Sequence, residues 1–394
     1  MRANGALVAL SVAAFTFVTT EVLPIGLLTV MADDLDRSDT QIGLLVTGYA
    51  AVVVVASIPL TRFTVHIPRR QLITAALAVF VAATLVTAVA QTYWVLLAAR
   101  LATALTQALF WSVVASTATG LFPPDVRGRA VARLAVGASL SPVVGVPVGT
   151  WIGQQAGWRV AFVVMAGVGL ATCVAVAVLV PTIPPAEGGA ARGTAPDARR
   201  YAILVVACAV GVAGFLTAYT YVTPFLLDVS GFAPAALGPL LLVIGLAGVA
   251  GTLIVGRFLD RSPWGALTVP LTASAVALLT LYLLGAAKGP ALAAVAVTVM
   301  AYAAFAAAVQ NRTLQVAPGS TDMAGAGSGS AFNAGIAAGS LLGGGLIQTA
   351  GVRSVALAGA GLAAAALALL LAEPWLTRSA RSPAPAGERV RLPG

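Results

Sequence analysis

One acidic residue, Glu21, lies inside an apolar stretch that reads FTFVTTEVLPIGLL from residue 15 to residue 28. Every other aspartate or glutamate falls in an expected connection, in a tail or at the end of an apolar run. In a bilayer such a carboxylate costs at least about 2.5 kcal/mol, so it should face the protein interior and titrate. We therefore predict that Glu21 binds and releases a proton; a structural carboxyl, hydrogen-bonded to a neighbouring helix, is the alternative. Pro24 frees a backbone carbonyl one turn earlier and permits a bend beside the acid.

Arg100 is the only basic residue that we place well inside an apolar run. Because a guanidinium group does not readily lose its proton, it needs a carboxylate, a carbonyl or water as a partner. We predict that Arg100 approaches Glu21 and takes part in proton coupling. A purely structural role, in which Arg100 holds helix ends together, is the alternative.

Polar and aromatic side chains elsewhere in the apolar runs are candidates for binding a small molecule. Thr103, Gln107 and Trp111 follow Arg100 on one helical face, and such a face would be wasted against lipid. Aromatic rings stack on the C–H surfaces of sugars, while hydroxyl and amide groups meet sugar hydroxyls. The predicted binding residues are Thr103, Gln107, Trp111, Tyr219, Tyr221 and Asn333. Interhelical hydrogen bonding is the alternative role for each of them.

A stripe of small or compact residues, Gly145, Pro147 and Gly149, leaves room for the close approach of a neighbouring helix. A hinge and simple packing would leave the same stripe. No phosphate-binding loop, nucleophile–base pair or metal-ligand spacing is present, and the two cysteines lie in apolar runs. We therefore expect neither an enzyme nor a bound cofactor or metal.

The composition dictates which elements must position these residues. Hydrophobic residues make up 59% of the 394 residues and charged residues only 9%, which excludes a water-soluble surface. Apolar runs of about twenty residues fit helices that cross a hydrocarbon core of roughly 30 Å, whereas barrel strands would be about half as long. We predict an all-α membrane protein. Its formal net charge of +9 comes from arginines spread through short connections, which argues against a nucleic-acid surface.

Twelve spans are expected, six on each side of the segment PTIPPAEGGAARGTAPDARR. The proline, glycine and charge content of this segment is typical of a flexible linker. The predicted spans are 5–31, 41–60, 72–92, 94–122, 130–152, 160–180, 201–227, 237–258, 265–286, 290–311, 323–347 and 352–372. The predicted domains are a bundle over 1–180, a cytoplasmic linker over 181–200, a second bundle over 201–376 and a disordered cytoplasmic tail over 377–394.

The distribution of basic residues predicts the orientation. Of the 22 lysines and arginines, seventeen fall in connections and termini assigned to one side and four in those assigned to the other, with Arg100 inside a span. Because positive residues resist translocation, both termini are expected in the cytoplasm.

An internal echo supports the division into two halves. GTWIGQQAGWR from Gly149 and GGGLIQTAGVR from Gly343 match at five of eleven positions, with an offset of 194 residues. TRFTVH from Thr61 and GRFLDR from Gly256 echo each other at an offset of 195. Since each half has an even number of spans, both copies would share one topology, as in parallel repeats.

Four segments carry a resemblance to a known family: TTEVLPIGLL, QALFWSVVAS, GVPVGTWIGQQAGWRVAF and YTYVTPFLLDVSGF. With the twelve spans, they resemble the major facilitator superfamily and, within its drug/proton antiporter group, the bacterial sugar-efflux branch. The resemblance implies two pseudo-symmetric six-helix bundles and proton-driven antiport through a central cavity that opens alternately to each side. It also implies that the halves meet and rock at the stripe of Gly145, Pro147 and Gly149.

The superfamily's loop after the second span departs from its usual form, Gly-x-x-x-Asp-Arg-x-Gly-Arg-Arg. TRFTVHIPRR keeps only Arg69 and Arg70, whereas the copy after the eighth span keeps Asp260 and Arg261. The resemblance implies a conformational role for these four residues. We expect the first loop to latch weakly.

The resulting hypothesis is a monomeric, proton-coupled exporter of sugars or related small polar molecules in the plasma membrane of a bacterium. Its partners would be that substrate, protons and lipid, without nucleic acid. The alternatives are a multidrug exporter on the same fold, an uncoupled facilitator or importer, and a non-transporting receptor. Glu21 argues against the facilitator, and the tail, which resembles no signalling domain, argues against the receptor.

Overall fold

A computed structural model describes residues 2–37, 39–182, 193–233 and 236–378. Within these ranges the chain is almost entirely helical and forms no β-strand, which confirms the predicted all-α class. The middle of the predicted linker 181–200 and nearly all of the predicted tail 377–394 lie outside the described residues.

The first half of the chain supplies six spans. The fifth is assembled from two α-helices joined by a π-helical turn, with a proline at the start of that turn. The elements are α1 (Arg2–Gly26), α2 (Leu28–Asp34), α3 (Asp39–Thr64), α4 (Arg69–Val89), α5 (Tyr93–Gly120), η1 (Pro124–Val126), α6 (Arg127–Leu140), η2 (Ser141–Gly145), α7 (Val146–Ala156) and α8 (Trp158–Leu179).

The second half supplies the other six spans. The elements are α10 (Ala198–Tyr219), α11 (Val222–Pro224), η3 (Phe225–Val229), α12 (Leu237–Val255), α13 (Pro263–Leu284), α14 (Lys288–Val316), α15 (Thr321–Ala350) and α16 (Ser354–Arg378). In the described part of the chain, ten segments are long and apolar enough to cross a membrane, and Gly48–Thr64 and Pro239–Val255 are shorter apolar helices. Together they account for the twelve predicted spans.

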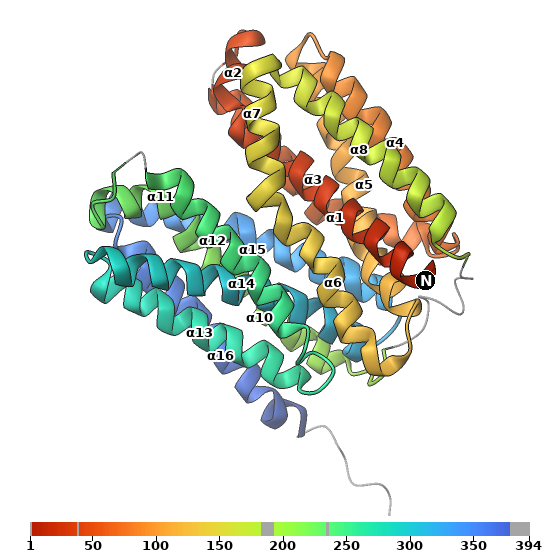
Figure 1. The fold of residues 1–394 in the computed structure, drawn as a ribbon. Helices are drawn as coiled ribbons and strands as arrows, with labels where there is room; N and C mark the ends of the chain where they lie inside the picture. Colours follow the sequence, from red (N-terminus) through yellow and green to blue (C-terminus); the bar gives the residue numbers. More distant parts are fainter. Residues whose placement is uncertain (1, 38, 183–192, 234–235, 379–394) are drawn as a thin grey trace, which may run out of the picture.

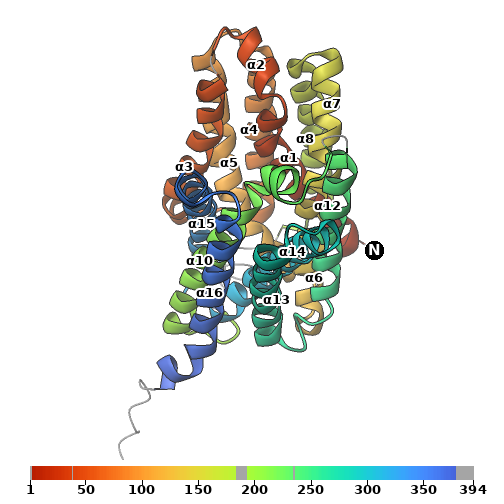
Figure 2. The same ribbon diagram turned by 90° about the vertical axis from the view of Figure 1, so that its left-hand side faces the viewer.

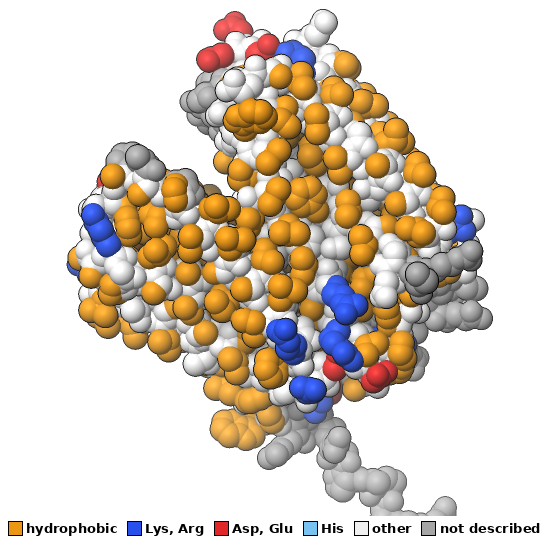
Figure 3. Space-filling view, viewed as in Figure 1, with side chains coloured by type: hydrophobic (Ala, Val, Ile, Leu, Met, Phe, Trp, Pro, Cys, Tyr) orange, Lys and Arg blue, Asp and Glu red, His pale blue; other side chains and the backbone are white. Residues whose placement is uncertain are grey.

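The helices gather into two bundles, α1 to α8 and α10 to α16, which occupy separate parts of the molecule in both ribbon views (Figures 1 and 2). The bundles meet where α15 packs against α3 and α5, and where α12 packs against α6. The surface is hollowed between them at the end that carries α2, α7 and α11 (Figure 3). We call this the open end. The opposite end, with the starts of α4, α6 and α15, is the closed end.

The two bundles share one packing register. In each, glycines of one long span lie so close to a parallel helix that a side chain would collide with that helix. The pairs are Gly145 with Thr19 and Gly149 with Leu23, and Gly339 with Ala213 and Gly343 with Thr217. The members of every pair are 126 residues apart, and each second-half pair lies 194 residues after its first-half counterpart. This spacing matches the echo seen in the sequence.

The same register ends two helices in the same way. Gly157 after α7 has a backbone φ of 92° and Gly351 after α15 has a φ of 81°. Residues other than glycine rarely adopt such positive values. The two glycines are also 194 residues apart. The repeated sequence AGWR and AGVR therefore encodes a helix stop.

Candidate functional site

Glu21 lies at the centre of a short hydrogen-bonded chain that joins three helices of the first bundle. The Gln107 Nε2 amide of α5 donates to Glu21 Oε2 of α1 at 2.7 Å. The Tyr49 hydroxyl of α3 donates to Gln107 Oε1 at 2.6 Å. Tyr49 and Gln107 are buried, whereas Glu21 remains partly exposed. The bond from Tyr49 to the amide oxygen fixes the amide so that its N–H group faces the carboxyl.

Arg100 is fully buried beside this chain and is paired with backbone oxygens. Its Nη1 donates to the Thr20 carbonyl at 2.7 Å and its Nη2 to the Glu21 carbonyl at 2.9 Å. Pro24 has no N–H group to offer the Thr20 carbonyl four residues earlier, so Arg100 supplies the missing donor. The guanidinium carbon also lies 4.7 Å from the centre of the Tyr49 ring.

No ion pair joins the Arg100 and Glu21 side chains, both of which belong to the described part of the chain. A permanent positive charge is thus held next to the carboxyl without occupying its oxygens. The sequence predicted the approach of Arg100 to Glu21, whereas it assigned Gln107 to substrate binding and gave no signal for Tyr49.

The other two candidates on α5 lie apart from the acid's hydrogen-bonded chain. The Thr103 hydroxyl is buried and donates to the Ala99 carbonyl of its own helix at 2.9 Å. Trp111 is partly exposed and lies edge-on to Phe110, with ring centres 5.4 Å apart. Of these two side chains, only that of Trp111 has exposed surface for a ligand.

Of the predicted binding residues in the second half, one packs against a neighbouring helix and two keep exposed surface. The Tyr221 hydroxyl donates to the Ser340 carbonyl at 3.0 Å, and its ring lies against Gly343 on α15. Asn333 is partly exposed and donates to the Gly329 carbonyl of its own helix at 3.0 Å. Tyr219 is partly exposed and stacks on Phe215, with ring centres 4.8 Å apart.

An aromatic cluster in the second bundle was missed from the sequence. Phe215 of α10 and Tyr302 of α14 stack nearly parallel, with ring centres 3.8 Å apart and an interplanar angle of 9°. Phe332 of α15 lies 5.8 Å from Tyr302, so the cluster spans three helices. Aromatic residues in apolar runs carry little signal on their own, because such residues fill cores in most proteins.

At the closed end, a buried ion pair joins the two bundles. Arg69, at the start of α4, pairs with Asp322, at the start of α15, and their side chains are 1% and 0% exposed. Ser116 of α5 donates to Asp322 Oδ1 at 2.8 Å. Arg69 was singled out in the sequence, whereas Asp322 was passed over because it lies at the end of a span. The weak latching expected of the first loop did not anticipate this pair, because it depends on Asp322 of the other bundle.

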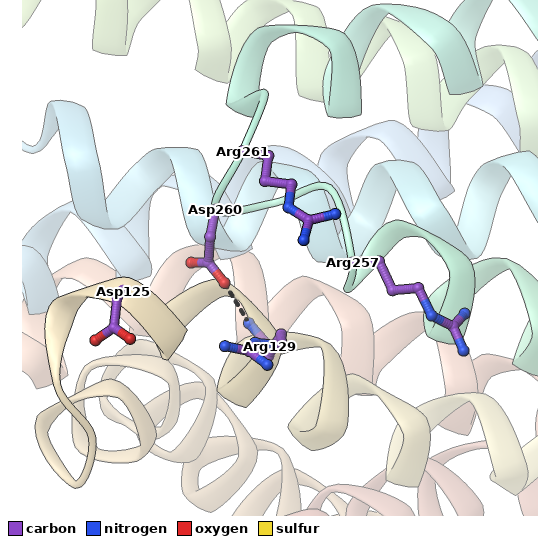
Figure 4. Close-up of a pocket in the computed structure, with 5 residues that line it drawn as sticks. All are labelled: Asp125, Arg129, Arg257, Asp260 and Arg261. Carbon is purple, nitrogen blue, oxygen red and sulfur yellow. Dashed lines mark hydrogen bonds between the residues drawn. The ribbon is translucent and has the colours of Figure 1, made fainter.

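A second contact at the closed end runs from the second bundle to the first. Asp260 Oδ1 accepts from the Gly128 N–H at 2.6 Å and Oδ2 accepts from the Arg129 N–H at 3.2 Å, which caps the start of α6. A pocket of about 210 Å³ lies beside this contact, lined by Asp125, Arg129, Arg257, Asp260 and Arg261 (Figure 4).

The remaining conformational candidates lie outside these two contacts. Arg70 donates to the Thr182 hydroxyl at 3.4 Å, and Arg261 is exposed at the pocket rim. Pro147 is exposed on α7, while Gly145 and Gly149 pack against α1.

The composite fifth span also touches the other bundle through α12. The Ser139 and Thr252 hydroxyls lie 2.8 Å apart, and Val143 fills the space over Gly245. This span therefore has α1 on one side and the second bundle on the other.

Comparison with known sequences finds one matching family model and several bacterial relatives. The family model described as "Major Facilitator Superfamily" matches residues 9–329. A probable sugar efflux transporter of Mannheimia succiniciproducens is 31% identical over 362 residues, which cover 91% of each chain. A probable sugar efflux transporter of Helicobacter pylori is 31% identical over 359 residues, which cover 91% of this chain and 92% of the relative.

Solved structures share the fold at low sequence identity. The human organic anion transporter MFSD10 (TETRAN) superposes with a TM-score of 0.77 at 15% identity, over 93% of this chain and 98% of that one. The proton:xylose symporter XylE, bound to 6-bromo-6-deoxy-D-glucose, gives a TM-score of 0.73 at 10% identity, over 94% and 95%.

Proposed function

Because the chain belongs to the major facilitator superfamily, we propose that it is a proton-coupled secondary transporter that exports sugars or related small polar molecules. The observation that carries this proposal is the Tyr49–Gln107–Glu21 chain, in which a partly exposed carboxyl has one oxygen held by an amide. The names of the bacterial relatives, probable sugar efflux transporters, support the substrate class. The bacterial relatives also favour the plasma membrane of a bacterium. We propose that the protein acts as a monomer.

The charge distribution supports the orientation. Arginines from both halves gather at the closed end, at the starts of α4 and α6 and in the turn between α12 and α13. We place this end and both termini in the cytoplasm, because basic connections resist translocation. The hollow between the bundles then faces outward, and the structure corresponds to an outward-open state.

Alternating access then follows from the way the bundles meet. Residues 1–180 and 201–376 would move as two bodies, joined by the linker 181–200. To open the cytoplasmic side, the Arg69–Asp322 pair and the Asp260 cap on α6 must separate, because each joins one body to the other. The glycine contacts of α6 to α7 with α1 lie within one body and persist throughout the cycle.

Proton binding and release at Glu21 would couple the inward movement of protons to the outward movement of substrate. In the outward-open state, protons enter from outside and neutralise Glu21 as substrate leaves. The inward-open state would return the proton to the cytoplasm, after which the ionised carboxylate accepts from Gln107 while substrate binds. Arg100 stays charged in both states and keeps the electrostatic background of the site constant, since its partners are backbone carbonyls.

A multidrug/proton antiporter is the second candidate. The observation in its favour is the aromatic cluster of Phe215, Tyr302 and Phe332, which could hold flat apolar compounds. An uncoupled facilitator is a weaker candidate. It would not require an acid at residue 21, and burying an acid in the membrane costs free energy.

Substrate-induced proton flux in proteoliposomes tests the proposal. The purified full-length protein would be reconstituted with a pH-sensitive dye inside, and arabinose, galactosides and lipophilic cationic dyes would be added in turn. Proton movement with sugars and not with the cations supports sugar/proton antiport. Movement with the cations alone supports the multidrug reading, and sugar uptake without any proton movement contradicts proton coupling.

A further inference from the structure

The two bundles carry different chemistry at one structural position. On the 194-residue register of α1 and α10, Glu21 corresponds to Phe215. The helices α5 and α14 start 195 residues apart, which sets Gln107 against Tyr302. The hydrogen bond between Glu21 and Gln107 in the first bundle therefore has as its counterpart the ring stack between Phe215 and Tyr302 in the second.

A second pair of contacts supports this correspondence. Phe17 of α1 stacks on Phe110 of α5, with ring centres 4.7 Å apart. The same offsets lead from these residues to Gly211 and Phe305, and Phe305 is the ring that lies against Gly211. Neighbouring helices in the two bundles thus meet through equivalent positions about one turn away from the proposed pair.

The rings of the second-bundle pair differ in exposure. Phe215 is buried, with 4% of its surface exposed, and serves as a backing for Tyr302 and Tyr219, which are both partly exposed. A parallel stack at 3.8 Å fixes the plane of the Tyr302 ring. A ring that is flat, fixed and partly exposed is suited to lie against the face of a ligand.

The Tyr302 hydroxyl is available to a ligand. No protein group in the described part of the chain bonds with it, in contrast to the hydroxyls of Tyr49 and Tyr221. The helix that carries Tyr302, α14, also contacts α5, the helix that carries Gln107, across the boundary between the bundles. A small molecule between the bundles would therefore meet Tyr302 on one side and the Glu21–Gln107 pair on the other.

We propose that Tyr302, backed by Phe215, determines the specificity of the transporter for cyclic sugars. Its ring lies against the C–H face of a pyranose while its hydroxyl bonds with a sugar hydroxyl, and Glu21 and Gln107 meet hydroxyls on the opposite face. An acyclic polyol has the hydroxyls but no flat C–H face to offer the ring, so it binds less well. This inference rests on the proposed function, because it names the substrate that the same site selects.

Binding of methyl β-D-galactopyranoside and of galactitol to the detergent-purified protein tests the proposal. For the wild type we expect at least about tenfold tighter binding of the galactoside. The Tyr302→Phe variant keeps the stack and loses one hydrogen bond, so galactoside binding should weaken by about three- to tenfold. In the Tyr302→Leu variant the preference for the cyclic sugar should fall close to one. Tyr282→Phe, on α13, is the matched control and should leave both affinities unchanged.

Three results would overturn the proposal: equal binding of the two ligands by the wild type, an unchanged preference in Tyr302→Leu, or unchanged galactoside binding in Tyr302→Phe. A thermal unfolding midpoint within a few degrees of the wild type would show that the Phe variant is folded. Sugar-induced proton flux, measured on the same preparations, separates the two levels. If the flux persists while the preference is absent, this inference fails alone; if no sugar binds or moves protons, the proposed function fails.

Discussion

The two bundles are built on one register, yet their centres differ in chemistry. At equivalent positions the first bundle has an acid held by an amide, Glu21 and Gln107, and the second has two stacked rings, Phe215 and Tyr302. The glycines that set the distance between helices are present in both. On the proposed function, the two copies of a repeated scaffold have different roles: the first bundle binds the proton and the second selects the substrate.

The largest effect should come from breaking the shared scaffold. Gly145→Leu and Gly339→Leu would drive a side chain into α1 and α10 respectively, because each glycine's missing Cβ position is already occupied. Overpacking of this kind costs about 1–3 kcal/mol or more, and the backbone of α10 cannot yield easily. We expect strong loss of folded protein for both, measured as the monodisperse fraction in size-exclusion chromatography.

Gly167→Leu and Gly361→Leu provide matched controls, since nothing lies within 4 Å of a Cβ at either position. They should give normal yields. If Gly145→Leu were as well folded as Gly167→Leu, the idea of a common register would lose its basis.

A second effect, on conformation and not on the yield of folded protein, should appear at the closed end. Asp322→Asn would leave Arg69 buried opposite a neutral side chain, and breaking a buried pair costs about 3–5 kcal/mol. We expect the population to shift toward a state with this end open. Pulsed electron paramagnetic resonance between spin labels at Gln71 and Ser262, one exposed residue from each bundle, would report longer distances.

Asp260→Ala tests the second contact between the bundles at the closed end. It removes a helix cap worth about 0.5–2 kcal/mol, so its shift in the distance distribution should be smaller than that of Asp322→Asn. Asp33→Asn, exposed at the open end, should cause no shift. A larger effect of Asp260→Ala than of Asp322→Asn would contradict the ranking of the two contacts.

The smallest effect on the transport cycle should come from the outer member of the acid's hydrogen-bonded chain. Tyr49→Phe removes the donor to Gln107 Oε1 and leaves a buried oxygen unpaired, which costs about 1–3 kcal/mol. We expect a thermal midpoint lowered by a few degrees and transport that is slower but still coupled to protons. Complete loss of coupling in this variant would move Tyr49 from a supporting role into the proton path.

Much of this arrangement could be predicted from the sequence. The isolated acid, the isolated arginine and the amide on the arginine's face are recognisable because each is costly against lipid. The twelve spans follow from run length, and the echo of AGWR and AGVR predicted the repeat that the glycine contacts display. Pro24 was placed correctly as the source of a free carbonyl, although its partner, Arg100, was not foreseen.

What the sequence could not supply were partners set by tertiary packing. Tyr49 and Tyr302 look like ordinary core aromatics until the folded chain sets Tyr49 against Gln107 and stacks Tyr302 on Phe215. Asp322 lies at a helix start, where acids are common for local reasons, and only the fold shows that α4 approaches it. Tyr221 illustrates the converse, because its candidacy rested on residue type and the structure places its hydroxyl against α15.

Proton coupling by Glu21 is the central claim, and Glu21→Gln tests it most directly. The variant keeps the size of the side chain and one oxygen that can accept from Gln107, replaces the other oxygen by an amide donor, and cannot titrate. In proteoliposomes, sugar-induced proton flux should disappear while sugar exchange across a proton-equilibrated membrane continues, with expression and folding near those of the wild type. Asp228→Asn, an exposed acid at the end of its span, should retain the flux. Flux retained in Glu21→Gln at the wild-type level would contradict the account.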